Sequence, residues 1–434
     1  MSQSIFIYCS FNTPRLQNVL DWVFKTRMGI SYTITDNKDH IANVHLAYGE
    51  FFPGIISIPS AGLLYEKGVQ KHEIKTGFWN NIPTLFDNTD NRFSLPFDIF
   101  SAIFFLLSRY EEYYEYIPDK HGRYPATDSI LYQYGWLERP LVDEWVYSLQ
   151  SFLYEKMSLE ASNRAFSFIP TYDIDIAWSY KNKGLTRNLG GIIKDILSGS
   201  IKTMLQRIAV LSNNKKDPYY SFEEITWLHK KFKLSPIYFV LVALRNGPFD
   251  KNISPRHPAM KKLIQFLSYE GIIGIHPSYE TRSIPALLTD EKTILEKIVG
   301  VTITQSRQHY IRLQLPYTYM QLSEAGITDD YSMGYGTHLG FRAGTGAVFR
   351  WYNLNKEEPT SLHIHPFCFM DSTAHYELKL TASHAFERLT KMAELLKNAN
   401  SRLITVFHNF SLGTDEEWAE WADAYANFLA DMAE

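Results

Sequence analysis

Two aspartates stand at alternate positions near the middle of the chain, in the segment FIPTYDIDIAWSY (168–180). The apolar run before them predicts a buried strand. Because side chains alternate across a strand, Asp173 and Asp175 are expected on one face, with no basic residue beside them. Two carboxylates this close raise each other's pKa unless a cation or a proton lies between them. Either the pair accepts hydrogen bonds from loop amides, or it is a metal ligand with a neighbouring general base.

Histidines follow other predicted strands in the same way. The apolar run IIGI leads into His276, and the run LITVF leads into His408. The segment SLHIHP offers His363 and His365. A single histidine is usually structural, but acids and histidines after several strands together suit zinc or another divalent transition metal. We therefore expect these strand ends to share one site.

The elements that must position these residues alternate in type. Predicted strands lie at 166–173, 235–244, 272–278, 361–367 and 402–408, and predicted helices at 189–214, 220–234, 257–271, 290–300, 382–399 and 415–432. Ser221 and Glu224 have the spacing of a capping box at the start of one helix. Repeated strand-then-helix units predict a parallel sheet, open or closed into a barrel, in which chemistry collects at the carboxyl ends of the strands.

The first part of the chain has a different pattern, with mixed α and β segments. Strands are predicted at 4–10 and 53–60, and helices at 14–29 and 97–117, the last of which has Asp98 as a possible N-cap. Polar residues near the end of that helix are interpreted as a solvated or salt-bridged helix end, with a polar site as the alternative; they are Ser108, Arg109, Glu111 and Glu112. We expect two domains, a smaller N-terminal α/β domain at 1–163 and a second domain at 164–434.

Composition excludes several classes of function. The chain of 434 residues has a formal charge of −4 and no dense basic run, so nucleic-acid binding is not expected. Two distant cysteines make a disulfide framework or a cysteine zinc site unexpected. We see no signal peptide and no apolar segment long enough to span a bilayer, so a cytoplasmic location is expected. Aromatic residues, 15% of the chain, fill a core or stack on sugars.

The motifs around these residues resemble those of the polysaccharide deacetylase superfamily, the NodB-homology fold of carbohydrate esterase family 4. The similar segments occur in the family's order over roughly residues 165–434; they are TYDID, GIHPSYE, SRQHYIRLQLP, DDYSMGY and ITVFHN. The segments LSRYEEY and GFRAGTG resemble a bacterial subgroup that carries an uncharacterised N-terminal domain. The resemblance implies a distorted (β/α) barrel preceded by the smaller α/β domain.

The resemblance also implies roles for individual residues. Asp173 would be the general base, and Asp175 and His276 would bind a divalent metal, with zinc the metal that we expect. His408 would protonate the leaving amine, and Arg307 would orient the base. The alternative for Arg307 is a surface ion pair.

Two further residues are expected to contact the substrate. Arg342 lies between glycines in GFRAGTG, a sequence that permits a tight turn close to a ligand. Tyr279 lies within the segment GIHPSYE, three residues after His276. Both are therefore expected to bind the substrate.

The third metal ligand is the point at which the sequence departs from the family pattern. Glu280 stands where the family has a second histidine, and His309 stands where it has a proline. A catalytic zinc site uses three protein ligands and one open position. A second carboxylate would reduce the Lewis acidity of the metal, whereas His309 restores an Asp/His/His set. We expect His309 to be the ligand, with Glu280 and then His365 as alternatives.

The function that follows from the resemblance is hydrolysis of N-acetyl groups from an aminosugar. The expected substrate is a carbohydrate, either a surface-polysaccharide precursor or a related glycan. The departures from the motif pattern leave a second interpretation open, a catalytically degraded protein that binds a glycan or a sugar nucleotide. A third interpretation keeps the chemistry but assigns a non-sugar amide as the substrate.

Overall fold

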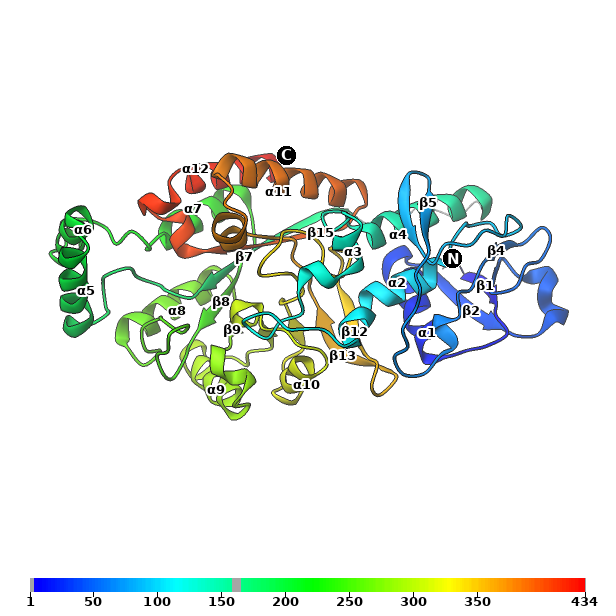
Figure 1. The fold of residues 1–434 in the computed structure, drawn as a ribbon, viewed down its shortest axis with the longest axis horizontal. Helices are drawn as coiled ribbons and strands as arrows, with labels where there is room; N and C mark the ends of the chain where they lie inside the picture. Colours follow the sequence, from blue (N-terminus) through cyan, green and yellow to red (C-terminus); the bar gives the residue numbers. More distant parts are fainter. Residues whose placement is uncertain (1–3, 158–164, 434) are drawn as a thin grey trace.

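The computed structural model describes residues 4–157 and 165–433. The chain forms two regions side by side, with the N-terminal region at one end of an elongated molecule (Figure 1). The domain boundary expected at residue 163 lies outside the described residues and stays a prediction. Among the described residues, no helix combines the length and the apolar character needed to cross a membrane.

The N-terminal region is built on a parallel sheet of four strands in the order β2-β1-β3-β4. These strands are β1 (Ser4–Tyr8), β2 (Ser31–Thr35), β3 (Leu46–Tyr48) and β4 (Ile56–Ile58). Around them lie α1 (Pro14–Leu20), α2 (Ile99–Leu107), α4 (Leu141–Met157) and the hairpin of β5 (Thr76–Trp79) and β6 (Ile82–Leu85), whereas α3 (Ile130–Gln133) lies against the second region. The expected mixed α/β character is confirmed.

The helix expected at 97–117 is much shorter in the structure. Asp98 caps its start as predicted, because its carboxylate accepts a hydrogen bond from the Ser101 amide at 2.9 Å. The α-helix ends at Leu107, and Arg109 adopts a left-handed conformation with φ of 54°. This turn directs the buried Arg109 guanidinium to Glu111 and Glu112, so ion pairing ends the helix. The prediction of a long helix was wrong.

The second region contains a nine-stranded sheet in the order β12-β13-β11-β10-β9-β8-β7-β15-β14. The strands are β7 (Ser167–Ile174), β8 (Ile237–Leu241), β9 (Ile272–His276), β10 (Gln305–Ser306), β11 (Asp329–Asp330), β12 (Phe349–Asn353), β13 (Glu358–Ile364), β14 (Phe369–Met370) and β15 (Arg402–His408). All neighbours pair in parallel except β12 and β13. Among the described residues the edge strands β12 and β14 are not paired with each other, so the expected closure into a barrel is not shown by the hydrogen bonds.

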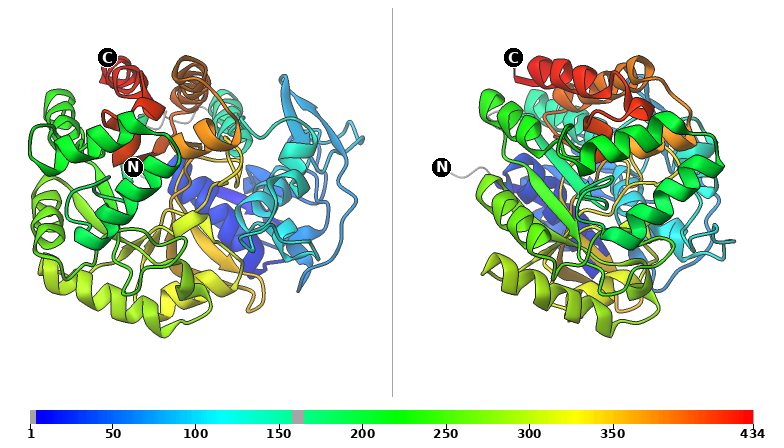
Figure 2. Two further views of the ribbon diagram at one scale, coloured as in Figure 1. Left: turned by 60° about the vertical axis from the view of Figure 1, so that its left-hand side comes forward. Right: turned by 90° about the vertical axis from the view of Figure 1, so that its left-hand side faces the viewer.

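Helices cover the outside of this sheet (Figure 2). They are α7 (Phe222–Phe232), α8 (Pro258–Glu270), α9 (Ala286–Val299), α10 (Tyr317–Glu324), α11 (Ala382–Asn398) and α12 (Trp421–Ala433). The capping box expected at Ser221 does not form: the Ser221 hydroxyl donates to the carbonyl of Asn409 at 2.6 Å and makes no cap hydrogen bond. A contact with a distant loop has replaced the local one.

Two remaining helices, α5 (Leu185–Leu197) and α6 (Ile201–Leu211), form a hairpin that projects from the end of the molecule opposite the N-terminal region (Figure 1). The sequence predicted one helical segment with an interruption at glycine and serine. In the structure the chain reverses at Ser198, Gly199 and Ser200.

The register of the central strands brings the predicted residues to one edge of the sheet. Asp173 on β7 pairs with His408 on β15 and with Phe239 on β8. On the next strand, Leu241 pairs with His276 at the end of β9. The acids and two of the histidines therefore end neighbouring parallel strands, as the sequence pattern indicated.

Candidate active site and metal centre

A cavity of about 420 Å³ lies at the carboxyl ends of these strands. Its wall includes the side chains of Asp173, Asp175, His276, His309 and His408. The N-terminal region also contributes to this wall, through Lys120, His121 and Arg123. Five of the eight residues expected from the sequence to act at the site thus line one cavity.

Asp175 is at the centre of the arrangement. Its Oδ1 lies 3.1 Å from Nε2 of His276, and its Oδ2 lies 3.4 Å from Nε2 of His309. Nε2 of His408 is also 3.4 Å from Oδ2. Three imidazoles therefore direct the same ring nitrogen toward one carboxylate.

The tautomers of the first two imidazoles follow from their other ring nitrogen. Nδ1 of His276 donates a hydrogen bond to the carbonyl of Arg307 at 2.6 Å, and Nδ1 of His309 donates to Asp250 at 2.9 Å. With Nδ1 engaged in this way, Nε2 is the nitrogen of each ring that is left to bind a metal. Asp250 was not identified from the sequence, although its position in the loop after β8, at the same edge of the sheet, was a usable signal.

These three residues have the composition of a metal site. Ligand atoms of Asp175, His276 and His309 all lie within 4.8 Å of one another. Asp175 Oδ1 is buried and has no hydrogen-bond partner of good geometry among the described residues. A buried carboxylate oxygen with this lack of a donor fits a bound cation.

The pKa values of the site residues also fit a bound cation. Although burial acts in the opposite direction, His309 and His276 hold the pKa of Asp175 well below its usual value. Although burial would lower it, the two carboxylates of Asp175 and Asp250 raise the pKa of His309 to about 9. A proton is therefore held between Asp175 and His309, in the position where a cation would compete for it.

The three candidates for the third ligand have different surroundings. His309 is brought to Asp175 and His276. Glu280 is exposed. His365 lies away from the cavity wall, with Nε2 2.8 Å from Asp329 and its ring stacked on Tyr331. Of the three, only His309 joins the cluster.

Asp173 is held by Arg307, which is completely buried. Nη1 of Arg307 donates to Asp173 Oδ1 at 2.9 Å and to the Thr171 hydroxyl at 2.7 Å. The guanidinium lies 4.5 Å from the centre of the Phe239 ring. That ring needs the space beside Gly274, where a Cβ would come within 2.5 Å of it. The alternative of a surface ion pair for Arg307 was wrong.

His408 forms a pair with Asp371, the residue immediately after β14. Nδ1 of His408 lies 2.6 Å from Asp371 Oδ1, and the backbone amide of His408 donates to the other carboxylate oxygen at 2.7 Å. Despite its burial, which acts in the opposite direction, Asp371 and Asp175 raise the pKa of His408 well above its usual value. Asp371 was also missed in the sequence, where a two-residue strand gives no visible pattern.

Two residues expected to contact the substrate do not line the cavity. Arg342 is buried and forms a two-pronged ion pair with Glu112 of the N-terminal region, with its Nε 2.8 Å from Oε1. Tyr279 lies behind the wall, with its ring stacked on Phe249 and its hydroxyl 3.0 Å from His121 Nδ1. The structure therefore gives these two side chains supporting positions and not direct access to the cavity.

The residues grouped near the end of α2 belong to the same contact between regions. Arg109 pairs with Glu111 at 2.7 Å and with Glu112 at 2.8 Å, and Glu112 in turn pairs with Arg342. All four side chains are buried. The expected salt bridges are present, but the expected solvated helix end is not, because this network is enclosed between the two regions.

Comparison with known proteins gives limited matches. The profile of a family of unknown function, DUF7033, matches residues 5–158. No curated protein matches the chain. Among solved structures, the polysaccharide deacetylase Bc1974 from Bacillus cereus is 9% identical, with a TM-score of 0.30 over 62% of this chain and 89% of that one.

Two other solved structures have similar values. Puue allantoinase is 12% identical, with a TM-score of 0.39 over 62% of this chain and 83% of that one. A probable polysaccharide deacetylase from Pseudomonas aeruginosa is 12% identical, with a TM-score of 0.37 over 62% and 84%. Likenesses this low carry no conclusion about activity.

Proposed function

We propose that the protein is a metal-dependent hydrolase that removes N-acetyl groups from an aminosugar of a surface-polysaccharide precursor or a related glycan. The observation that carries this proposal is the direction of three imidazole Nε2 atoms toward Asp175, beside a second carboxylate, Asp173, that is held by a buried arginine. Ligands, a base and an acid are then present in one cavity. This combination is what hydrolysis of an unactivated amide requires.

In this proposal Asp175, His276 and His309 hold the metal, with zinc the best match to one carboxylate and two imidazoles. When bound, such a metal polarises the amide carbonyl and lowers the pKa of water. Asp250 and the Arg307 carbonyl keep the two imidazoles in the tautomer that can bind it.

Asp173 acts as the general base. Arg307 binds its Oδ1, so the second oxygen, Oδ2, remains to take the proton of the attacking water. The hydrogen bond from the guanidinium fixes the orientation of this carboxylate. The side chain of Arg307 is thus a positioning group and does not itself touch the substrate.

His408 acts as the general acid. Its Nδ1 is bonded to Asp371, so its Nε2 carries the proton that the leaving amine needs. The negative charge of Asp371 stabilises the protonated ring, which keeps a proton available at neutral pH.

The cavity wall suits a sugar substrate. Aromatic side chains from several loops surround the cluster; they are Tyr219, Phe249, Tyr310, Tyr376 and Phe410. Aromatic rings present flat apolar faces with polar rims, as sugar rings require. The volume of about 420 Å³ falls in the range of small-molecule sites.

The experiment is to measure acetate release from N-acetylhexosamine oligomers and from N-acetylated sugar nucleotides, with protein stripped of metal and with protein reloaded with zinc. The proposal predicts release only by the reloaded protein. Stoichiometric zinc without acetate from any of these compounds, together with saturable glycan binding, would support the binding interpretation. Acetate or another acid released only from non-sugar amides would keep the chemistry and reject the substrate class.

A further inference from the structure

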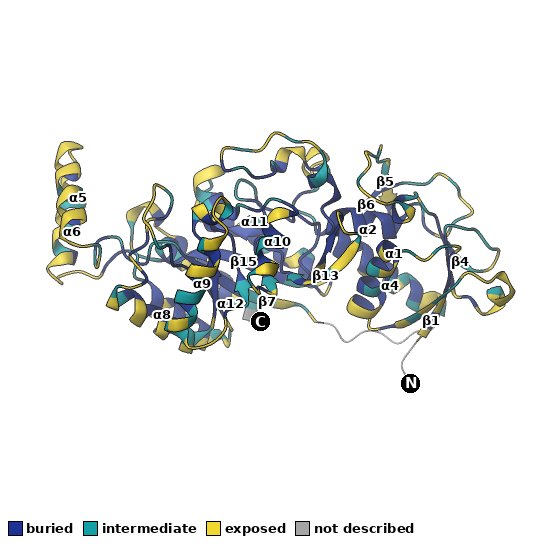
Figure 3. Ribbon diagram, turned by 90° about the horizontal axis from the view of Figure 1, so that it is seen from below, coloured by how far each residue is buried: buried dark blue, intermediate teal, exposed yellow. Residues whose placement is uncertain are grey.

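The projecting α5–α6 hairpin exposes an unusual amount of apolar surface. Nine leucine and isoleucine side chains on it are between 38% and 83% exposed; they are Leu185, Leu189, Ile193, Ile196, Leu197, Ile201, Leu205, Ile208 and Leu211. Burial colours show the two helices as predominantly exposed (Figure 3). Most of these residues recur at intervals of three or four, so each helix has an apolar stripe that faces solvent.

Two polar side chains of the hairpin, by contrast, are buried. Asp195 is buried and forms an ion pair with Arg207 at 2.9 Å, which joins α5 to α6. Asn188 is also buried and donates to the carbonyl oxygens of Tyr180 and Gly184. A helical hairpin in water normally buries its apolar face and exposes its polar one. This hairpin instead exposes most of its leucine and isoleucine side chains together with several lysines and arginines, which an apolar, anionic environment outside it would explain.

The charge of the hairpin also differs from that of the chain. Residues 181–216 contain eight basic residues and one acidic residue, in a chain of 43 basic and 47 acidic residues. The one acid, Asp195, is already paired with Arg207. The hairpin is therefore strongly cationic on an otherwise acidic protein, and its preferred partner is an anionic surface.

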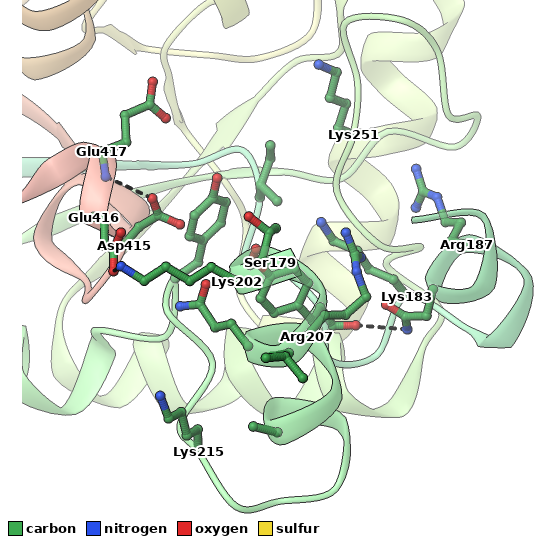
Figure 4. A pocket seen from close by; sticks show the side chains of 18 residues that line it. Ser179, Lys183, Arg187, Lys202, Arg207, Lys215, Lys251, Asp415, Glu416 and Glu417 are labelled. Carbon is green, nitrogen blue, oxygen red and sulfur yellow. Dashed lines mark hydrogen bonds and ion pairs between the residues drawn. The ribbon is translucent and has the colours of Figure 1, made fainter. Parts of the chain in front are cut away.

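Many of these cations surround a cleft of about 840 Å³ between the hairpin and the loops that contain Ser179, Lys251 and Asp415 (Figure 4). Its wall includes Lys183, Arg187, Lys202, Arg207, Lys215 and Lys251, opposite Asp415, Glu416 and Glu417. Burial, and then the charges of Arg187, Arg207 and Lys251, lower the pKa of Lys183 to about 8 in spite of Asp217. Positive charge is thus crowded on the inner side of the hairpin.

We propose that the α5–α6 hairpin docks this protein on a membrane that contains anionic lipids. The leucine and isoleucine stripe enters the boundary between headgroups and acyl chains, and the flanking lysines and arginines lie at the level of the lipid phosphates. A second copy of the chain is a poorer occupant, because two hairpins face to face would bring two strongly cationic segments together. The proposal concerns binding to a surface and does not depend on the reaction proposed above.

Docking in this way would place the active site close to the lipid surface. The cationic cleft and the metal cavity share Ile176, Tyr219 and Lys251 as wall residues, so the two spaces are adjacent. A substrate held in the membrane by a lipid anchor would reach the cavity through the cleft.

The test is flotation of the full-length protein with vesicles of phosphatidylcholine alone and with vesicles that also contain phosphatidylglycerol. We expect binding to the anionic vesicles, and weakening of that binding as salt is raised. Replacement of three exposed apolar residues, in the variant Leu189→Ser/Ile193→Ser/Ile196→Ser, should reduce the partition coefficient at least about tenfold. These side chains are exposed, so the variant is expected to keep the melting temperature of the wild type.

Two further variants test whether vesicle binding depends on the position of the apolar side chains and on the positive charge of the hairpin. A matched control removes the same number of exposed aliphatic side chains elsewhere, as Ile117→Ser/Ile284→Ser/Val301→Ser, and should bind like the wild type. The variant Lys194→Gln/Lys215→Gln should reduce binding to the anionic vesicles about thirtyfold, since each of the two lysines near such a surface contributes about 1 kcal/mol.

Three results would overturn the proposal. One is failure of the wild type to float with anionic vesicles. Another is equal flotation of the wild type and the hairpin variant with serine at 189, 193 and 196. The third is a wild-type dimer in light scattering that this variant converts to a monomer, with no vesicle binding, which would assign the apolar face to a second copy. Activity toward a soluble substrate is measured separately, so failure of docking and failure of the proposed hydrolysis are distinguishable.

Discussion

Asp173 near the end of β7 and Asp175 just after it are two residues apart, yet the fold gives them different partners. Asp173 accepts a hydrogen bond from Arg307, whereas Asp175 faces three imidazoles and no arginine. A carboxylate held by a guanidinium suits a base, and one without a donor suits a metal ligand. At the scale of single residues, the neighbours on β9 and β15 and in the segment after β10 therefore decide which acid has which role.

The identity of the third ligand gives the first prediction. His309→Ala should lose most of its bound zinc, because removal of one of three protein ligands leaves an incomplete site. Glu280→Ala should keep its zinc, since that carboxylate is exposed. Metal content of the two variants, measured side by side after the same dialysis, checks this. Loss of metal from the Glu280 variant alone would assign the ligand to Glu280.

The pair of His408 and Asp371 gives the second prediction. The charge of Asp371 raises the pKa of His408, so Asp371→Asn should lower that pKa. A general acid works only while protonated, so the alkaline limb of the profile of kcat against pH should move to lower pH, by about one unit or more. Ser411→Ala is the control, because it removes a hydrogen bond to Asp371 and leaves its charge. An unmoved alkaline limb in the asparagine variant would mean that another group is the acid.

Protonation of His309 gives the third prediction. With a pKa of about 9 in the metal-free protein, this imidazole keeps its proton at neutral pH and must release it when metal binds. Zinc affinity should therefore increase with pH up to about 9, by about tenfold per pH unit for each proton released. Competition with a chelator of known affinity at several pH values measures it. An affinity that is independent of pH between 7 and 9 would contradict this assignment.

At the scale of elements, the strands that carry the site were predictable, because each is a continuous apolar run ending in an acid or a histidine. The two-residue strands β10 and β11 were not, since two residues have no periodicity. The end of α2 was missed for another reason. Its position is set by Arg109, whose ion pairs and contact with Tyr335 depend on the packing of distant segments. Asp250 and Asp371 were missed because their partners come from other loops.

The buried ion network at this element gives the fourth prediction. Glu112→Gln should destabilise the protein by about 3–5 kcal/mol, because it leaves the buried guanidinium groups of Arg109 and Arg342 short of an anion. Glu115→Gln, at an exposed position in the same segment, is the control and should change little. Urea unfolding of both variants measures the difference. Equal midpoints would show that the network contributes nothing to stability.

At the scale of the whole molecule, the N-terminal region is part of the site. It supplies His121 and Arg123 to the cavity wall and binds Arg342 behind it. At the opposite end, the α5–α6 hairpin supplies a cationic, apolar surface beside the adjoining cleft. The sequence indicated where the chemistry lies, but the contact of residues before 158 with the strand ends was visible only in three dimensions.

The central claim is the division of work between the two aspartates, and one paired measurement tests it most directly. Zinc content and acetate release are determined for Asp173→Asn and Asp175→Asn under the same conditions. We expect Asp173→Asn to keep stoichiometric zinc and to lose at least about a hundredfold in kcat, whereas Asp175→Asn should lose its zinc. Equal loss of zinc in both variants, or full turnover by Asp173→Asn with zinc bound, would contradict it.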